Sequence, residues 1–418
     1  MDHFTYHKGE LHAEGVALSR IADAVGTPFY CYSSATLTHH VSVLREGLSA
    51  FNPLICFAVK ANSNIAVLRT LRDAGTGADV VSEGEIRAAL AAGIAPAHII
   101  FSGVGKTRSE MRYALSQGIF QFNVESEPEL HALSDEAVAA GKTAHIAIRV
   151  NPDVDADTHA KISTGKKENK FGVAIDRAPA LYAHAASLPG IRVQGVSMHI
   201  GSQLTSLAPF EAAYIRARQL VEALRAAGIA IRTLDIGGGL GVPYHADAAI
   251  PTPAEYGAMV TRVLAGLDVE LIVEPGRLIA GNAGVMVTRV IYVKHEGERD
   301  YVIVDAAMND LMRPALYDAY HTIIPARQSQ SPAAPVDIVG PVCETGDTFA
   351  LQREMPEASE GDLLVFRTAG AYGASMSGTY NLRPLIPEVL VKDNAFSIIR
   401  RRQTYEELLA RDSFAEWQ

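Results

Sequence analysis

The chain has 418 residues, of which 48% are hydrophobic, and a mean hydropathy of +0.09, values typical of a soluble globular protein with room for two domains. A formal net charge of -10 and a pI near 5.8 argue against nucleic acid or an anionic membrane as a partner. No stretch approaches the roughly twenty apolar residues of a membrane span, and the N-terminus lacks the basic and apolar regions of a signal peptide. The cysteines Cys31, Cys56 and Cys343 have no metal-type spacing, so we expect a reducing cytoplasm.

Residues 1 to about 28 predict a pair of strands and then a short helix. The helix is expected over Leu18 to Val25, where it is ended by Gly26 and Pro28.

From residue 29 to about 283, short apolar strands alternate with alanine-rich amphipathic helices. Eight such strand-then-helix units can be counted, with strands in ICFAVKAN, GADVVSEGE, IIFSGVGK, FQFNVES, HIAIRVNP, VQGVSMHIGS, TLDIGGGLG and ELIVEPGRL. Eight parallel units predict an α/β fold, a (β/α)8 TIM-like barrel, whose active-site mouth lies just past the strand ends. A doubly wound open sheet is the alternative, but the glycines of residues 237–241 have the wrong spacing for GxGxxG and come late in the chain.

After Gly284 the helical rhythm stops. Strand-length apolar or alternating segments follow, with turns between them, and a helix is expected from Thr404 to Arg411. We therefore predict a barrel domain at residues 29–283. A second, mostly β domain (a β-sandwich or barrel) would be formed by 1–28 and 284–418.

Lys60 stands at the end of the strand that begins at Ile55. A lysine just past a buried strand is ordinarily one that extends to solvent, but a desolvated lysine can form a Schiff base with a carbonyl cofactor. The loops after the seventh and eighth strands read GGGLG (237–241) and EPGR (274–277), the positions at which such barrels often bind phosphate. A glycine cluster by itself is more often a tight turn.

Glu274 and His199 end the eighth and sixth strands. Glu274 could pair with Arg277 three residues later, or it could face a pyridine nitrogen and keep it protonated. His199 by itself would be a core histidine, whereas beside a ring cofactor it could stack on the ring.

Several motifs, in this order along the chain, resemble those of the pyridoxal-phosphate-dependent diaminopimelate decarboxylases. They are AVKAN, GADVVSEGE, STGKKENKFG, SMHIGSQ, DIGGGLG, EPGR, MNDLMRP, CETGD and AGAY, and they extend from about Phe29 to Tyr380. The same fold group includes alanine racemase and the eukaryotic-type ornithine decarboxylases.

The resemblance implies pyridoxal 5'-phosphate as the cofactor and a role for each matching residue. Lys60 would bind the cofactor covalently, His199 would stack on its ring, and Glu274 would face its nitrogen. The cofactor phosphate would be bound by Gly239, Gly276, Arg277 and Tyr372, and the substrate by Arg277, Arg313, Tyr317, Glu344 and Tyr372. Cys343 would donate a proton, and the partner subunit of a homodimer with shared active sites would contribute it together with Glu344.

The implied reaction converts the small molecule meso-2,6-diaminopimelate to L-lysine and CO2, the last step of lysine biosynthesis. The two ends of this substrate each carry a carboxylate and an amine, which suits arginine forks together with Glu344. Without the resemblance, Arg313 could be a surface arginine, Tyr317 a core tyrosine and Cys343 a buried, inert thiol. Two alternatives remain: a decarboxylase of ornithine or carboxynorspermidine, and a cofactor-free regulator that keeps the fold.

Overall fold

The computed structural model describes residues 2–154, 170–245, 248–297 and 299–418. The chain forms two compact units. One, the barrel unit, comprises Thr38–Pro243 and Ala249–Ile279; the other, the β unit, comprises Met1–Leu37, Tyr244–Ala248 and Ala280–Gln418. The motif STGKKENKFG lies largely outside the described residues.

Eight parallel strands form the closed barrel that the sequence predicts. They are β5 (Leu54–Ala58), β6 (Gly77–Val80), β7 (Ile99–Phe101), β8 (Gln121–Val124), β9 (Ala144–Asn151), β11 (Ile191–Ser197), β12 (Thr233–Asp235) and β13 (Glu270–Val273). The sheet closes because β13 pairs with β5 and β8 pairs with β9, which rules out the doubly wound alternative. The two-residue strand β10 (Val173–Ala174) pairs with β9 as well.

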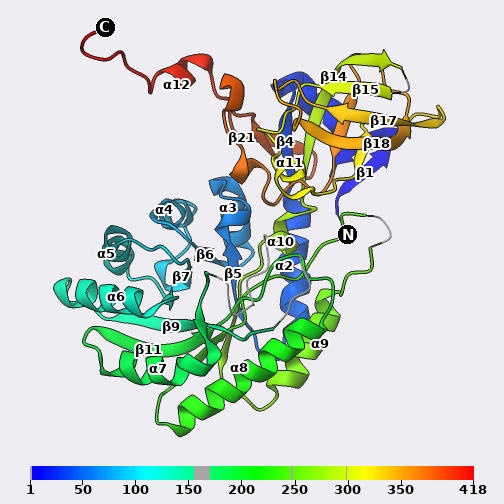
Figure 1. Ribbon diagram of the computed structural model, residues 1–418. Helices are drawn as coiled ribbons and strands as arrows, with labels where there is room; N and C mark the ends of the chain where they lie inside the picture. Colours follow the sequence, from blue (N-terminus) through cyan, green and yellow to red (C-terminus); the bar gives the residue numbers. More distant parts are fainter. Residues whose placement is uncertain (1, 155–169, 246–247, 298) are drawn as a thin grey trace. The chain divides into compact units, whose positions relative to one another are not determined.

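Helices pack around the barrel strands (Figure 1), and each of them except α2, which precedes β5, follows a barrel strand. They are α2 (Ser34–Gly47), α3 (Ile65–Asp73), α4 (Glu83–Ala91), α5 (Arg108–Gln117), α6 (Glu127–Ala139), α7 (Ala178–Ser187), α8 (Ala208–Ala226), α9 (Pro253–Leu264) and α10 (Arg277–Ala280). Single-turn 3-10 helices occur at Val59–Ala61 (η1), Pro96–His98 (η2) and Ile175–Arg177 (η3).

Polar residues past the strand ends start several of these helices. Ser82 and Ser126 accept hydrogen bonds from the backbone N–H groups of Glu85 and Glu129, three residues into α4 and α6. Each such cap stabilises a helix by about 1 kcal/mol. The chain therefore reverses direction directly after a strand, and the side chains at that point remain at the barrel rim.

The β unit is built on one large mixed sheet, to which the N-terminal segment contributes a central strand. The long strand β14 (Gly284–Glu296) pairs antiparallel with β4 (Phe29–Ser33), and β4 pairs in parallel with β20 (Glu388–Lys392). The other strands of the sheet are β15 (Arg299–Val304), β16 (Ile323–Pro325), β17 (Ala333–Val339), β18 (Thr348–Pro356), β19 (Leu363–Phe366) and β21 (Ala395–Arg400). Residues 29–33, which begin the predicted barrel range, thus pair within this sheet.

A small antiparallel sheet and three helices complete the β unit. The sheet contains β1 (Phe4–His7), β2 (Glu10–Ala13) and β3 (Val16–Ala17), and α1 covers the predicted Leu18–Val25. The last helix, α12 (Tyr405–Leu409), is shorter than predicted, because Thr404 is its N-cap and Ala410 its C-cap. α11 (Arg313–Tyr317) lies between β15 and β16, and single 3-10 turns occur at Ala374–Met376 (η4) and Tyr380–Leu382 (η5).

Alternate residues of the central strands form the apolar core of the β unit. Cys31 of β4, Val285 and Val287 of β14, and Val389 and Val391 of β20 all belong to one buried cluster. Each large apolar side chain buried in this way contributes about 1.5–3 kcal/mol. Among the described helices, none is long and apolar enough to cross a bilayer.

Candidate active site

Lys60 and Asp79 form an ion pair at the C-terminal rim of the barrel. The backbone register pairs Ala58, the last residue of β5, with Asp79 on β6, and Lys60 follows two residues later in η1. Its Nζ lies 2.7 Å from Oδ2 of Asp79, which is fully buried, while the Lys60 side chain remains 39% exposed. The lysine is therefore held by a buried carboxylate and still reaches the opening of the barrel.

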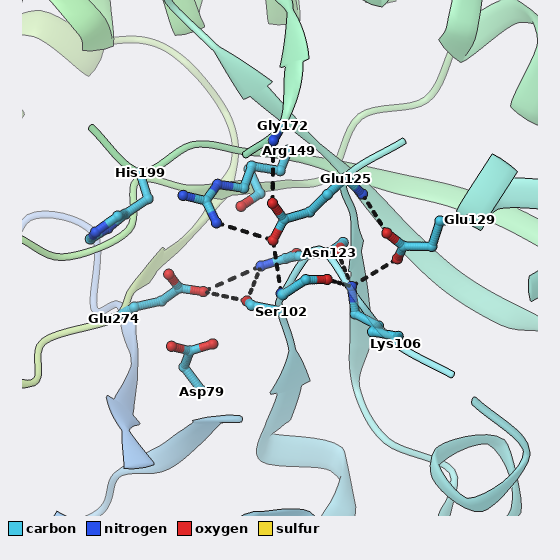
Figure 2. A network of polar contacts seen from close by, with 12 residues as sticks. Asp79, Ser102, Lys106, Asn123, Glu125, Glu129, Arg149, Gly172, His199 and Glu274 are labelled. Carbon is cyan, nitrogen blue, oxygen red and sulfur yellow. Dashed lines mark hydrogen bonds and ion pairs between the residues drawn. The ribbon is translucent and has the colours of Figure 1, made fainter. Parts of the chain in front are cut away.

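Glu274 lies in a buried polar cluster built from the ends of several strands. It follows β13, and its Oε1 accepts hydrogen bonds from Asn123 Nδ2 at 3.2 Å and from Ser102 Oγ at 3.4 Å (Figure 2). Asn123 also donates to Oδ2 of Asp235 at 2.9 Å. Because parallel strands end at the same rim, residues from three other strands, β7, β8 and β12, surround this carboxylate.

Burial raises the pKa of Glu274 well above its usual range, and the negative charges of Asp235 and Asp79 raise it further, against the charge of Lys60. Burial raises the pKa of Asp235 as well. Three carboxyl groups thus share a buried region with one lysine. Because one lysine cannot balance three buried negative charges, such a region favours either protonation of a carboxyl group or the binding of a second cation.

His199 is half-buried and stands beside the glycine loop that follows β12. Its Nδ1 accepts a hydrogen bond from the Gly238 N–H at 3.2 Å, which leaves the ring proton on Nε2. Burial lowers the pKa of His199 well below its usual value, and the charges of Arg149 and Lys60 lower it further. The ring therefore presents a neutral face.

The glycines of this loop are required by close backbone contacts. A Cβ on Gly238 would lie 2.2 Å from the carbonyl oxygen of Glu274, and one on Gly239, where φ is +113°, would lie 2.4 Å from that of Gly201. Side chains are excluded here, so the loop exposes backbone instead. Arg277 begins α10 after the EPGR loop, where its Nη2 donates to Ser202 Oγ at 3.2 Å.

A second polar network adjoins this cluster and was not predicted from the sequence. Lys106, whose side chain is 1% exposed, donates to the carbonyl oxygens of Gly103 and Asn123 and to Glu129 Oε1, at 2.7–2.8 Å (Figure 2). Arg149 pairs with the buried Glu125 at 3.1 Å. Several of these residues lie near the ends of barrel strands, so polar residues at strand ends were the signal that could have indicated them.

The remaining predicted residues belong to the β unit. Arg313 and Tyr317 begin and end α11. The Arg313 side chain is buried, donates from Nη1 to His321 Nε2 at 2.9 Å and stacks over the Tyr244 ring at 4.6 Å. His321 Nδ1 lies 2.9 Å from the carbonyl oxygen of Arg367, to which it donates, so its Nε2 carries no proton and accepts the hydrogen bond from Arg313.

Cys343 and Glu344 are exposed, so the alternative of a buried cysteine is wrong. The Cys343 N–H donates to Asn381 Oδ1 at 3.1 Å, and Glu344 is hydrogen-bonded to Tyr380, whose pKa it raises. Tyr372 is half-buried and adopts a left-handed backbone with φ of +55°. Of the predicted residues, Lys60, His199, Gly239, Glu274, Gly276 and Arg277 thus belong to the barrel unit.

A closed eight-stranded barrel with a lysine, buried carboxylates and a glycine loop at its C-terminal rim defines a class of cofactor-dependent enzymes. The family model described as "Pyridoxal-dependent decarboxylase, pyridoxal binding domain" matches residues 35–281. The chain is 51% identical to the diaminopimelate decarboxylase of Vibrio cholerae and 52% identical to that of Pseudomonas aeruginosa, in each case over 99% of both chains. It therefore belongs to the diaminopimelate decarboxylase family.

Solved structures agree with this assignment. Diaminopimelate decarboxylase of M. jannaschii, in complex with L-lysine, superposes with a TM-score of 0.95 at 35% identity and covers 99% of this chain and 98% of its own. The Helicobacter pylori enzyme, also with L-lysine, has a TM-score of 0.91 at 41% identity, covering 94% of this chain and 98% of its own.

The barrel residues fit pyridoxal 5'-phosphate, the cofactor of this family. Among the described residues, none hydrogen-bonds the buried Oδ1 of Asp79, and the nearby Glu274 has a raised pKa, so this region is suited to a protonated pyridine nitrogen. The glycine loop offers backbone rather than side chains, as close approach of a phosphate requires. The amine of Lys60 lies at the same rim of the barrel.

Proposed function

We propose that this chain decarboxylates meso-2,6-diaminopimelate to L-lysine and CO2 with pyridoxal 5'-phosphate. The observation that carries the proposal is the buried carboxylate cluster around Glu274, beside Lys60 on the same barrel rim. The bound cofactor supplies an electron sink for the charge left on the substrate when CO2 departs. A carboxylate facing the ring nitrogen keeps that nitrogen protonated.

The barrel residues hold and orient the cofactor in this proposal. Lys60 binds it covalently, and His199, with its neutral face, stacks on the ring. The carboxylate of Glu274 pairs with the protonated ring nitrogen. Hydrogen bonds from Asn123 and Ser102 position that carboxylate. The backbone N–H groups of Gly239, Gly276 and Arg277, with the Tyr372 hydroxyl, bind the phosphate.

The substrate is bound by residues of both charges. Arg277 and Arg313 grip carboxylate, because a guanidinium presents two parallel donors, and Glu344 pairs with the distal ammonium. Tyr317 and Tyr372 donate hydroxyl hydrogen bonds. The contacts of Arg313 with His321 and Tyr244 support this role, since they orient the guanidinium in advance.

Cys343 delivers a proton to the substrate carbon after CO2 is lost, and its exposure supports a role outside the core of its own unit. We propose that Cys343 and Glu344 act in the barrel of a partner subunit, which makes the enzyme a two-fold symmetric homodimer. The three free cysteines support the cytoplasm as the compartment.

A CO2-release assay over a panel of substrates tests the activity. The purified enzyme with added pyridoxal phosphate should release CO2 from meso-diaminopimelate and form L-lysine, with much smaller rates on L-lysine, L-ornithine and carboxynorspermidine. Faster turnover of ornithine or carboxynorspermidine would favour the alternative substrates. An absorbance band near about 420 nm would report bound cofactor independently of turnover.

A further inference from the structure

Two histidines and a glutamate from two neighbouring helices converge on the surface of the barrel unit. Glu127 and His131 lie one helical turn apart on α6, and His184 lies in the last turn of α7. Their ligand atoms all lie within 4.8 Å of one another. The two Nε2 atoms are 3.2 Å apart, with ring centroids at 4.9 Å and an interplanar angle of 55°.

This spacing suits two ligands of one metal ion. Zinc binds histidine nitrogen at about 2.0–2.1 Å, so two nitrogens on a tetrahedral ion are separated by about 3.3 Å. A carboxylate and two imidazoles are also a donor set that zinc prefers, and three protein ligands leave the fourth position open. We propose that Glu127, His131 and His184 bind one Zn²⁺ ion, with water at the open position.

The three side chains are accessible from solvent, and the nearby cation, Arg177, pairs only weakly with Glu127. Glu127 and His184 line a surface depression of about 640 Å³ together with Asp176 and Arg177. Arg177 lies 3.9 Å from Glu127 and is 76% exposed, so its hold on the carboxylate is weak. An ion at this position would link α6 to α7. The competing explanation for the short Nε2 separation is a hydrogen bond between two neutral rings.

Titration calorimetry of the holoenzyme with ZnCl2 tests the site. We expect the wild type to bind one equivalent of zinc with a micromolar or smaller dissociation constant. In His131→Gln and His184→Gln, binding should be lost or weakened by about tenfold to a hundredfold. His98→Gln, which changes an exposed histidine outside the cluster, is the matched control and should bind like the wild type. Arg177→Ala should bind zinc at least as tightly.

The comparison of variants separates this site from others, including the exposed thiol of Cys343. Thermal unfolding with and without ZnCl2 gives a second readout, because an ion that binds the folded state raises Tm. The Tm should rise for the wild type and for His98→Gln and rise less for His131→Gln, with equal Tm values in metal-free buffer. Equal zinc affinity in the wild type and both histidine variants, or no binding up to about 1 mM, would overturn the proposal.

Discussion

Nζ of Lys60 lies 2.7 Å from Oδ2 of Asp79 on the neighbouring strand β6, and this lysine is far more exposed than Lys106, which pairs with Glu129 on the same barrel. Lys106 is 1% exposed and donates to three oxygens, which satisfies every proton of its ammonium group. Lys60 remains 39% exposed, so of these two lysines it is the one whose amine a carbonyl group can reach.

Lys60→Ala should therefore abolish decarboxylation even with excess pyridoxal phosphate. It should also remove the covalent link that borohydride reduction traps, measured by mass spectrometry of the reduced protein. Lys294→Ala, at an exposed lysine of β14, is the control and should retain both. A Lys60→Ala protein that still traps the cofactor would assign the link to another lysine.

The buried pair of Lys106 and Glu129 should behave as a unit. Lys106→Met leaves Glu129, 6% exposed, without its cation, so we expect a loss of about 3–5 kcal/mol in the free energy of unfolding. Glu129→Leu should cost a similar amount, and the double variant less than the sum. Urea unfolding of the four proteins in the cycle measures this coupling, and strict additivity would contradict it.

Glu85, on α4, should make stability depend on pH. Burial raises its pKa to about 7, with Asp79 raising it slightly and the Val81 N–H and Lys60 opposing the shift. Because the folded pKa exceeds the unfolded value of about 4.3, the folded state binds more protons, and this contribution to stability is lost as pH rises from about 4.3 to 7.

Glu85→Gln should remove that loss. Its free energy of unfolding, relative to the wild type, should increase with pH across this range by at most about 1.4 kcal/mol per unit and level off above about pH 7. Urea unfolding at a series of pH values checks the slope. A difference that does not vary with pH would mean that Glu85 titrates normally.

Arg313→Ala should reduce kcat/KM for meso-diaminopimelate by the equivalent of roughly 2–5 kcal/mol, because the substrate carboxylate would lose its charged partner. The cofactor absorbance should stay unchanged. Arg313→Lys should recover little, since an ammonium group cannot replace the two parallel donors or the contact with the Tyr244 ring. Near-normal kinetics for Arg313→Ala would mean that the distal carboxylate is bound elsewhere.

Mixing two inactive variants tests the shared site. If Cys343 acts in the partner's barrel, a dimer of one Lys60→Ala and one Cys343→Ala chain has one site with both lesions and one with neither. With equal mixing and random pairing, about half the dimers are mixed and about a quarter of all sites are intact. Activity should approach that fraction. No recovery in mixtures that demonstrably exchange subunits would place Cys343 in its own chain's site or outside the site.

Local patterns in the sequence were sufficient for the barrel strands and for α1. Each barrel strand is a short apolar run followed by a polar residue or glycine, and each helix shows a helical spacing of apolar residues. Both patterns can be recognised in the local sequence without knowledge of distant contacts. The same holds for Lys60, His199 and Glu274, which follow strands directly. Confirmation of the closed barrel came from the pairing of β8 with β9 and of β13 with β5.

Long-range packing decided the rest. β18 contains exposed charged and polar residues and β16 has only three residues, so neither carries a local period that predicts a strand; each is a strand because a neighbouring strand supplies its hydrogen bonds. The raised pKa of Glu274 and the neutral ring of His199 likewise result from burial and from charges on other strands. Sequence therefore determined which residues stand at the barrel rim, whereas tertiary structure decided their charges and partners, because desolvation depends on atoms far away along the chain.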